Sequence, residues 1–155
     1  MNSILATTRR MTASPDNIPA GETKLSIIVP YTTPARTRIA MTHAAAMSSG
    51  LNATIRLIDA VAVPIQCPMS EPPVNGEFLK NRMREVAEGC EVPVEAEIVF
   101  TRDRMECFRH KSGAGSIVVI VVDSLWWPRF EVKLARSLVR TGHDVVLVSR
   151  DGSHR

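Results

Sequence analysis

The chain has 155 residues, of which 45% are hydrophobic and 23% are charged, and its net charge is +3. This length and composition are typical of one soluble globular domain, and the charge is too small for a dedicated nucleic-acid binder. No apolar run approaches the roughly 20 residues that a membrane-spanning helix needs.

The chain begins with a polar segment, residues 1–24, that is rich in Ser, Thr and Pro and lacks a continuous apolar run. We expect a flexible tail there. The β-branched run at residues 25–30 then predicts a buried strand. Residues 35–49 are rich in Ala and Met and end before Gly50, which predicts a helix. Residues 53–61 predict the second strand.

The middle of the chain holds a long irregular loop, because residues 64–76 contain four prolines. Apolar residues at helical spacing predict a helix at 77–88. Alternation with a period of two at 92–100 predicts a third strand with one wetter face, near an edge of the sheet. Asp103 can cap a short helix that runs to about Lys111.

The clearest element is the continuous β-branched run at residues 116–122, which predicts a central strand covered on both faces. Pro128 fits the first turn of the last helix, and Gly142 closes that helix. The fifth strand follows at Val145, Val146, Leu147 and Val148, and residues 151–155 form a polar C-terminal tail.

Five strands that alternate with helices imply an α/β fold over residues 25–150. We expect a single doubly wound, five-stranded parallel sheet with right-handed crossovers and helices on both faces, as in flavodoxin-like domains. No internal repeat or second domain is apparent.

The sequence offers no support for catalysis or metal binding. Cys67, Cys90 and Cys107 form no CxxC pair, and an odd number of cysteines fits a reducing cytoplasm. The four histidines lie in different predicted elements, and GxSxG, Walker A and HExxH motifs are absent. We therefore predict no catalytic residues and no metal, with slow ATP hydrolysis left open.

The order of these segments resembles the universal stress protein family over residues 25–149. The resemblance lies in strand one ending in Val29-Pro30, an Ala-rich first helix, the proline-rich loop, the run at 118–122, and a last helix leading into a short apolar strand. It implies the strand order 3-2-1-4-5 and frequent dimerisation through the last strand. In one subgroup it also implies ATP or AMP at the carboxyl ends of strands one and four.

The family features that hold the nucleotide are missing. Thr32 stands where the nucleotide-binding subgroup has an Asp, and Asp123 stands at the first glycine of its GxxGx9G(S/T) motif. The late Gly-Ser pair falls near Val132 and Lys133. Without glycines, backbone N–H groups cannot gather closely around a phosphate, and Asp123 adds a repelling charge unless a cation intervenes. No cofactor is expected, and ATP or AMP is the alternative.

Several side chains remain candidates. The cleft candidates lie at the carboxyl ends of the strands and are Tyr31, Thr32, Val61, Asp123 and Ser124. The tandem indoles of Trp126 and Trp127 favour plugging of the empty cleft, with partner binding as the alternative. The cations Arg129, Lys133, Arg136 and Arg140 recur at helical spacing, which favours a solvated helix face and leaves contact with an anion open.

The resemblance and these departures from it predict a cytoplasmic regulatory or interaction module of the universal stress protein type, without regular ATP binding or turnover. We expect a homodimer through Val145, Val146, Leu147 and Val148, an unknown protein partner, and neither nucleic acid nor a membrane span. Two alternatives stay open. One is a nucleotide-binding stress protein with a divergent cleft, and the other is a stand-alone relative of a transporter-associated cytoplasmic regulatory domain.

Overall fold

The computed structural model describes residues 4–10, 25–113, 115–123 and 129–150, with backbone only for the first of these ranges. Its strands are β1 (Ile4–Arg10), β2 (Ser26–Pro30), β3 (Thr54–Ala62), β4 (Val94–Thr101), β5 (Ser116–Val122) and β6 (Asp144–Ser149). Its helices are α1 (Pro34–Leu51), α2 (Gly76–Glu88), α3 (Arg104–Lys111) and α4 (Phe130–Arg140).

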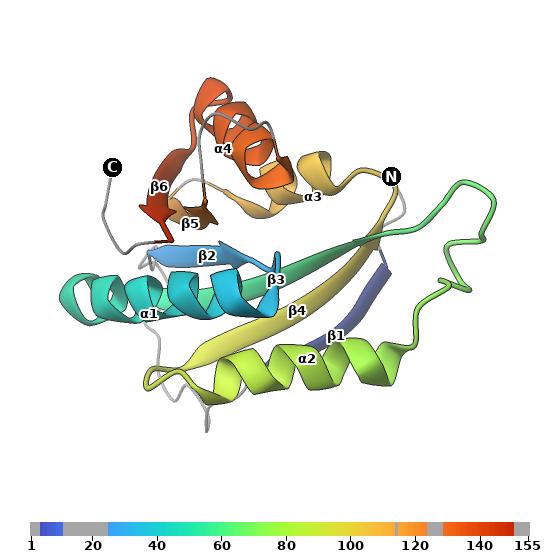
Figure 1. Ribbon diagram of the computed structural model, residues 1–155, viewed down its shortest axis with the longest axis horizontal. Coiled ribbons are helices and arrows are strands. Elements are labelled where there is room, and N and C mark those ends of the chain that lie inside the picture. The colour runs from blue at the N-terminus through green and yellow to red at the C-terminus, as the bar shows by residue number, and fades with distance from the viewer. Residues whose placement is uncertain (1–3, 11–24, 114, 124–128, 151–155) are drawn as a thin grey trace, which may run out of the picture.

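The strands form one sheet in the order β1-β4-β3-β2-β5-β6 (Figure 1). From β4 to β6 every neighbouring pair is parallel. If β2 is counted as the first strand, this is the order 3-2-1-4-5, so the predicted fold class is confirmed. Because each parallel connection passes through a helix, the helices cover both faces of the sheet.

Within the predicted flexible tail at residues 1–24, the structure describes one segment, and that segment is a strand. Residues Ile4–Arg10 form β1, which pairs antiparallel with β4 from Ile4 opposite Phe100 to Arg10 opposite Glu95. A strand at this place satisfies backbone groups that β4 would otherwise present at an open edge. The third predicted strand therefore lies one position in from the edge, and the sheet gains a sixth, antiparallel member.

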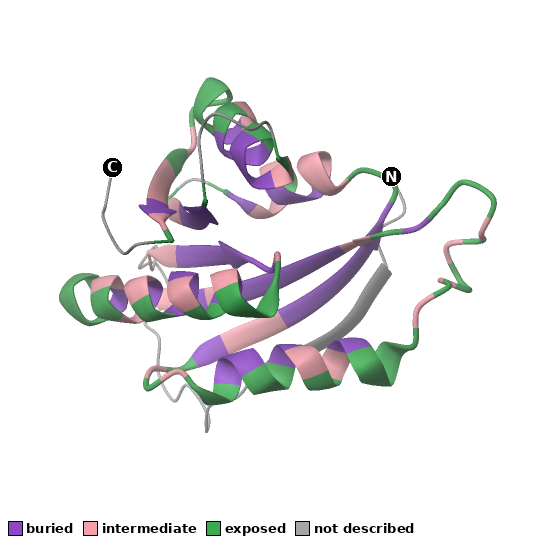
Figure 2. Cartoon of the chain, in the orientation of Figure 1, coloured by how far each residue is buried: buried purple, intermediate pink, exposed green. Residues whose placement is uncertain are grey.

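Two apolar layers hold the helices to the sheet. In Figure 2 the buried residues gather along the strands and on parts of the helices. The layer under α1 and α2 includes Ile27, Val29 and Met83. The layer under α3 and α4 includes Ile28, Phe108 and Leu134. Alternate residues of β2 enter opposite layers, as expected for a strand covered on both sides.

Helix α1 begins close to the predicted position but ends later. The Thr33 hydroxyl accepts a hydrogen bond from the Arg36 N–H, and Pro34 occupies the first turn. The helix continues through Gly50, and Asn52 takes the left-handed conformation with φ of 50°. Asn tolerates this conformation better than most residues, so the predicted glycine stop is unnecessary.

The proline-rich loop between β3 and α2 is fastened at its start by Arg102. The guanidinium donates to the carbonyl oxygens of Val63 at 3.0 Å and Cys67 at 2.8 Å, and also to that of Pro64. One side chain thereby satisfies three carbonyls of a segment that has no ladder partner. Within the described ranges, no helix has the length and apolar character required to cross a membrane.

Substitution of Arg102 tests this fastening. In Arg102→Ala we expect the amide of Cys67, which donates to the Pro64 carbonyl at 2.9 Å, to exchange hydrogen roughly fivefold faster, since the lost bonds are worth about 1 kcal/mol locally. Hydrogen exchange followed by mass spectrometry measures this. Arg84→Ala on α2 is the control, and equal exchange in both variants would contradict the role of Arg102.

Candidate functional site

The candidate site lies where the sheet changes direction, between β2 and β5. The connection after β2 leads to α1 on one face, whereas the chain after β5 leads to α4 on the other. In open α/β sheets, ligands bind in the crevice that such a reversal leaves at the carboxyl ends of the strands. Thr32 and Asp123 follow these two strand ends, as the sequence analysis predicts for the first and fourth strands.

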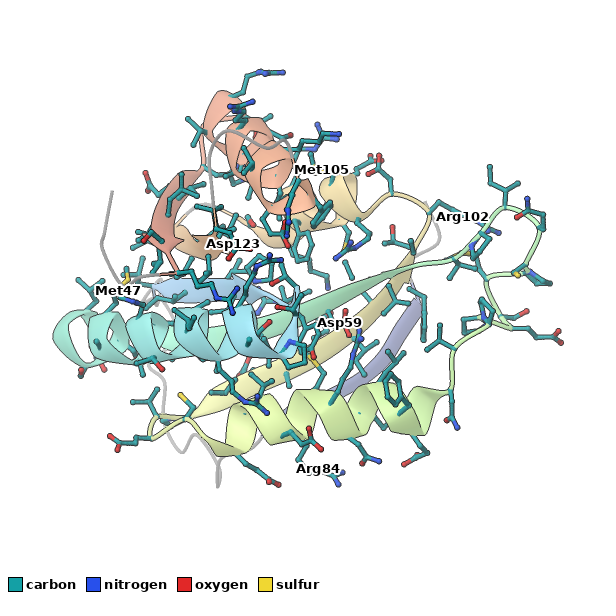
Figure 3. The ribbon with its side chains drawn as sticks, viewed as in Figure 1. Met47, Asp59, Arg84, Arg102, Met105 and Asp123 are labelled. Atoms are coloured by element: carbon teal, nitrogen blue, oxygen red, sulfur yellow. The ribbon has the colours of Figure 1, made fainter. Side chains whose placement is uncertain are left out.

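Asp123, which is labelled in Figure 3, lies within 4 Å of three arginines. Its carboxylate is bonded by the Arg36 guanidinium and lies 3.5 Å from Arg129 Nη1 and 3.9 Å from Arg150 Nη1. Arg36 also donates to Glu131 Oε1 at 3.1 Å. We call these five residues the switch-point cluster. From the sequence, Asp123 is expected to repel a phosphate unless a cation intervenes. In the structure, arginines of this chain are the cations that neutralise it.

The cluster has a buried half and an exposed half. The side chains of Arg36 and Glu131 are 13% and 11% exposed, whereas those of Arg129 and Arg150 are 56% and 63% exposed. Exposed ion pairs contribute little to stability, so Arg36 is the main partner of Asp123. Its hydrogen bond holds the pKa of Asp123 below the ordinary value, and the same bond raises the pKa of Arg36.

The two candidates after β2 are occupied within the protein. The Thr32 backbone N–H donates to Thr37 Oγ1 at 3.1 Å, and Thr37 is 1% exposed. The Tyr31 ring is 2% exposed and packs in the layer under α1 and α2. Its hydroxyl has no hydrogen-bond partner among the described residues, and burial raises its pKa. The Thr32 N–H is therefore satisfied within the protein, and the Tyr31 side chain belongs to the core.

A second charged pair lies deeper, in the layer under α1 and α2. The Asp59 carboxylate, on β3, is 3% exposed and is bonded by the Arg82 guanidinium from α2. That guanidinium lies 4.5 Å from the centre of the Tyr31 ring, at cation–π distance. Burial raises the pKa of Asp59, and Arg82 opposes that shift. Asp59 falls within the strand predicted at residues 53–61, and the sequence pattern does not identify Arg82 as its counter-ion.

The opposite side of the β3 end is held by Arg104. Its Nε donates to the Ala60 carbonyl at 2.8 Å, and its guanidinium lies 3.9 Å from the centre of the Phe130 ring. Burial lowers its pKa. The cleft candidate Val61 follows Ala60, is half-buried, and packs on the layer under α1 and α2.

The remaining candidates are placed only in part. Ser124, Trp126 and Trp127 lie outside the described residues. The four residues proposed for a dimer interface lie in β6, the last strand of the sheet. Three of them are half-buried and Val148 is fully buried (Val145, Val146, Leu147, Val148).

The described residues contain no group of three or more His, Cys, Asp or Glu side chains that could hold a metal. His143 Nδ1 lies 2.9 Å from Thr141 Oγ1 and 3.3 Å from the Leu138 carbonyl oxygen, contacts that belong to the end of α4. Cys107 is buried, which raises the pKa of its thiol and makes it a poor nucleophile.

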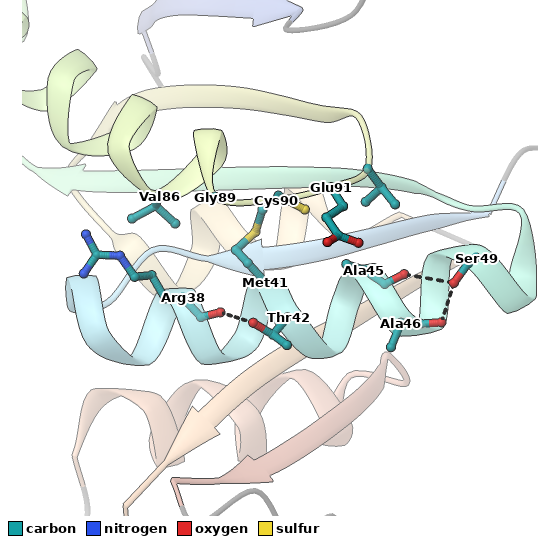
Figure 4. A pocket seen from close by; sticks show the side chains of 11 residues that line it. Arg38, Met41, Thr42, Ala45, Ala46, Ser49, Val86, Gly89, Cys90 and Glu91 are labelled. Atoms are coloured by element: carbon teal, nitrogen blue, oxygen red, sulfur yellow. Dashed lines mark hydrogen bonds between the residues drawn. The ribbon is translucent and has the colours of Figure 1, made fainter.

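A groove of about 730 Å³ lies away from this site, between α1 and the turn after α2 (Figure 4). Met41, Ala45 and Val86 give it an apolar lining, and Arg38 and Glu91 add opposite charges. The hydroxyls of Thr42 and Ser49 are bonded to carbonyls of α1 itself. The groove therefore offers few free polar groups to orient a ligand.

Comparisons with known proteins support the resemblance at the level of the fold. No protein-family model matches the sequence, and no curated protein matches it. A solved structure described as "Crystal structure of universal stress protein in complex with cAMP" has a similar fold, with a TM-score of 0.51 and 12% sequence identity. The match covers 82% of this chain and 98% of that chain. At this identity the likeness concerns the architecture and does not extend to the residues of the site.

The Asp59–Arg82 pair provides a test with a defined pH dependence. In Arg82→Leu the buried carboxylate loses its counter-ion, and we expect the free energy of unfolding at pH 7 to fall by about 3–5 kcal/mol. The variant raises the folded-state pKa of Asp59 further above its unfolded value of about 3.9. The deficit should therefore shrink as the pH falls from about 7 to about 5, because the folded state then binds the proton.

Urea denaturation at both pH values measures this deficit. Arg84→Leu, on an exposed position of the same helix, is the control and should stay within about 0.5 kcal/mol of the wild type. A deficit in Arg82→Leu that is equally small, or that does not change with pH, would show that Arg82 does not neutralise Asp59.

Proposed function

We propose that the chain is a regulatory or interaction module of the universal stress protein type, in which its own Asp123 occupies the place of a bound phosphate. The observation that supports this most is the switch-point cluster. Arg36, Arg129 and Arg150 converge on the Asp123 carboxylate at the end of β5. Arginines suit phosphate and carboxylate equally well, and here they are already engaged.

The backbone N–H groups at Thr32 and Asp123 are also poorly placed to bind a phosphate. A phosphate loop needs N–H groups that approach the anion closely, which glycine permits. Asp123 takes the position of the first such glycine, and the Thr32 N–H is bonded to Thr37. A nucleotide bound in the usual manner would have to displace the Asp123 carboxylate from Arg36 and overcome its charge.

A role without turnover agrees with the chemistry at hand. The described residues bring no nucleophile and base together at the crevice, and the charged groups there pair with each other. We propose that the module acts by binding a protein partner. Its expected location in the cytoplasm remains a prediction from its cysteines.

Nucleotide binding in a divergent cleft is the second candidate function. Arg129 and Arg150 are more than half exposed and face the same carboxylate. An incoming phosphate could exchange with Asp123 as their partner. The similar structure was solved with cAMP, which makes cyclic and linear adenine nucleotides the first ligands to test.

Calorimetric titration with ATP, AMP and cAMP distinguishes the two functions. We expect no saturable binding by the wild type at ligand concentrations up to about 1 mM. In Asp123→Asn the repelling charge is gone and three arginines are released, so affinity for each nucleotide should rise at least about tenfold.

Asp144→Asn, at the first residue of β6, removes an equal charge outside the cluster and should leave binding unchanged. Micromolar affinity of the wild type, or nucleotide released from the protein as purified, would favour the second candidate and contradict the proposal.

Dimerisation through β6 is part of the proposed function. Among the described strands β6 pairs only with β5, so its other edge is open to a second copy. We expect a dimer in sedimentation equilibrium that persists when the salt concentration is raised, because backbone hydrogen bonds and apolar contacts resist screening. A monomer at every concentration tested would exclude this interface.

A further inference from the structure

The outer surface of α4 carries a continuous row of cations. Arg129 precedes the helix, and Lys133, Arg136 and Arg140 follow at intervals of four, three and four residues. At 100° and 1.5 Å per residue, the four Cα positions fall within about 60° of each other around the helix and span about 17 Å along it. All four residues are exposed. We call this row the α4 ridge.

The α4 ridge points directly away from the sheet. Leu134 and Leu138 on the opposite side of the helix are fully buried, and α4 forms part of the outer layer on its face (Figures 1 and 2). The cations therefore occupy the most accessible line of the helix, where a partner meets no obstruction from neighbouring helices of the described chain.

Most of the ridge charge is unbalanced within the described part of the chain. Lys133, Arg136 and Arg140 form no ion pair with a described residue. The acidic residue of α4, Glu131, is buried and bonded to Arg36. On α2, in contrast, three acids and three bases are mixed, and Lys80 Nζ lies 3.6 Å from Glu77.

The stability of the helix does not explain this row. Like charges three and four residues apart repel each other. Arg140 lies in the last turn, where a cation favours the helix dipole, but Arg129 lies at the positive end. A partner of opposite charge would relieve the repulsion and account for the whole row.

An apolar side chain beside the ridge indicates what kind of partner fits. Val139 is 60% exposed and lies three residues after Arg136, about 60° from it around the helix. A nucleic-acid backbone is contacted by cations and polar donors, so it would leave the apolar Val139 uncovered. A protein helix with carboxylates at matching intervals and one apolar neighbour would satisfy both features.

We propose that the α4 ridge docks an acidic amphipathic helix of a partner protein. The inference rests on the proposed function in so far as it gives the interaction module a class of partner, but it does not use the Asp123 carboxylate. The ridge variants below keep Arg129, so the switch-point cluster remains intact and the two proposals can fail separately.

The probe is a peptide of about 20 residues, long enough to form a helix, with Glu at positions i, i+4, i+7 and i+11 and a Leu beside that row. A second peptide has the same composition but spreads the Glu residues around the helix. Fluorescence anisotropy with the full chain measures both affinities at low and at physiological salt.

We expect the matched peptide to bind more tightly than the scrambled one. Its affinity should fall at least about tenfold in K133Q/R136Q/R140Q, because several charge pairs are lost together. The variant K80Q/R84Q/R109Q removes the same number of cations from α2 and α3 and should bind as the wild type does. Asp123→Asn should also bind the peptide normally, which separates this result from the nucleotide test.

The proposal is overturned by equal binding of the two peptides, by an equal loss in the control variant, or by no binding at all. Single-stranded RNA and vesicles containing phosphatidylserine are tested in parallel. Tighter binding of either one, lost in the ridge variant, would assign the ridge to a nucleic acid or a lipid surface instead and would equally overturn it.

Discussion

The ion pair between Arg36 and Asp123 is the interaction on which the proposed function depends. Arg36 lies in the first turn of α1, which covers one face of the sheet, and Asp123 follows β5 at the crevice. The same guanidinium reaches Glu131 on α4, which covers the opposite face. One largely buried cation thus joins both layers at the point where open α/β sheets bind their ligands. In the proposed function, the Asp123 carboxylate takes the arginines that a bound phosphate would need.

A nucleotide site and this cluster differ in where their positive and negative charges come from. A phosphate loop supplies partial positive charge from backbone N–H groups and waits for an external anion. Here the cations are side chains and the anion is internal, so the site is neutralised without a ligand. The α4 ridge begins at Arg129 in this cluster and carries positive charge outward along the helix. The arginines of the cluster are paired with Asp123, whereas the ridge cations farther along α4 have no acidic partner among the described residues. The proposed protein partner would supply the acids.

Periodicity and β-branched runs were sufficient to predict the parallel sheet, because a strand buried on both faces such as Ser116–Val122 has few alternatives. They also placed Thr32 and Asp123 at the ends of neighbouring strands. Sequence patterns could not predict the contact between Arg36 and Asp123, because these residues are far apart in the sequence. Nothing in the local sequence distinguishes Arg36 from an arginine that is exposed to solvent. A charge at Asp59 within an apolar strand was a usable signal for a buried counter-ion. The pairing of Ile4–Arg10 with β4 could not be predicted from the sequence, because it depends on which strand lies at the edge of the sheet.

The pKa of Asp123 in the folded protein tests the central claim most directly. Carboxyl-carbon NMR as a function of pH should show Asp123 titrating below the ordinary Asp value of about 3.9, because Arg36 stabilises its charged form. In Arg36→Gln the pKa should return toward that value, with Arg129 and Arg150 too exposed to hold it down. An ordinary pKa in the wild type, or no change on substitution of Arg36, would mean that Arg36 does not hold the Asp123 carboxylate.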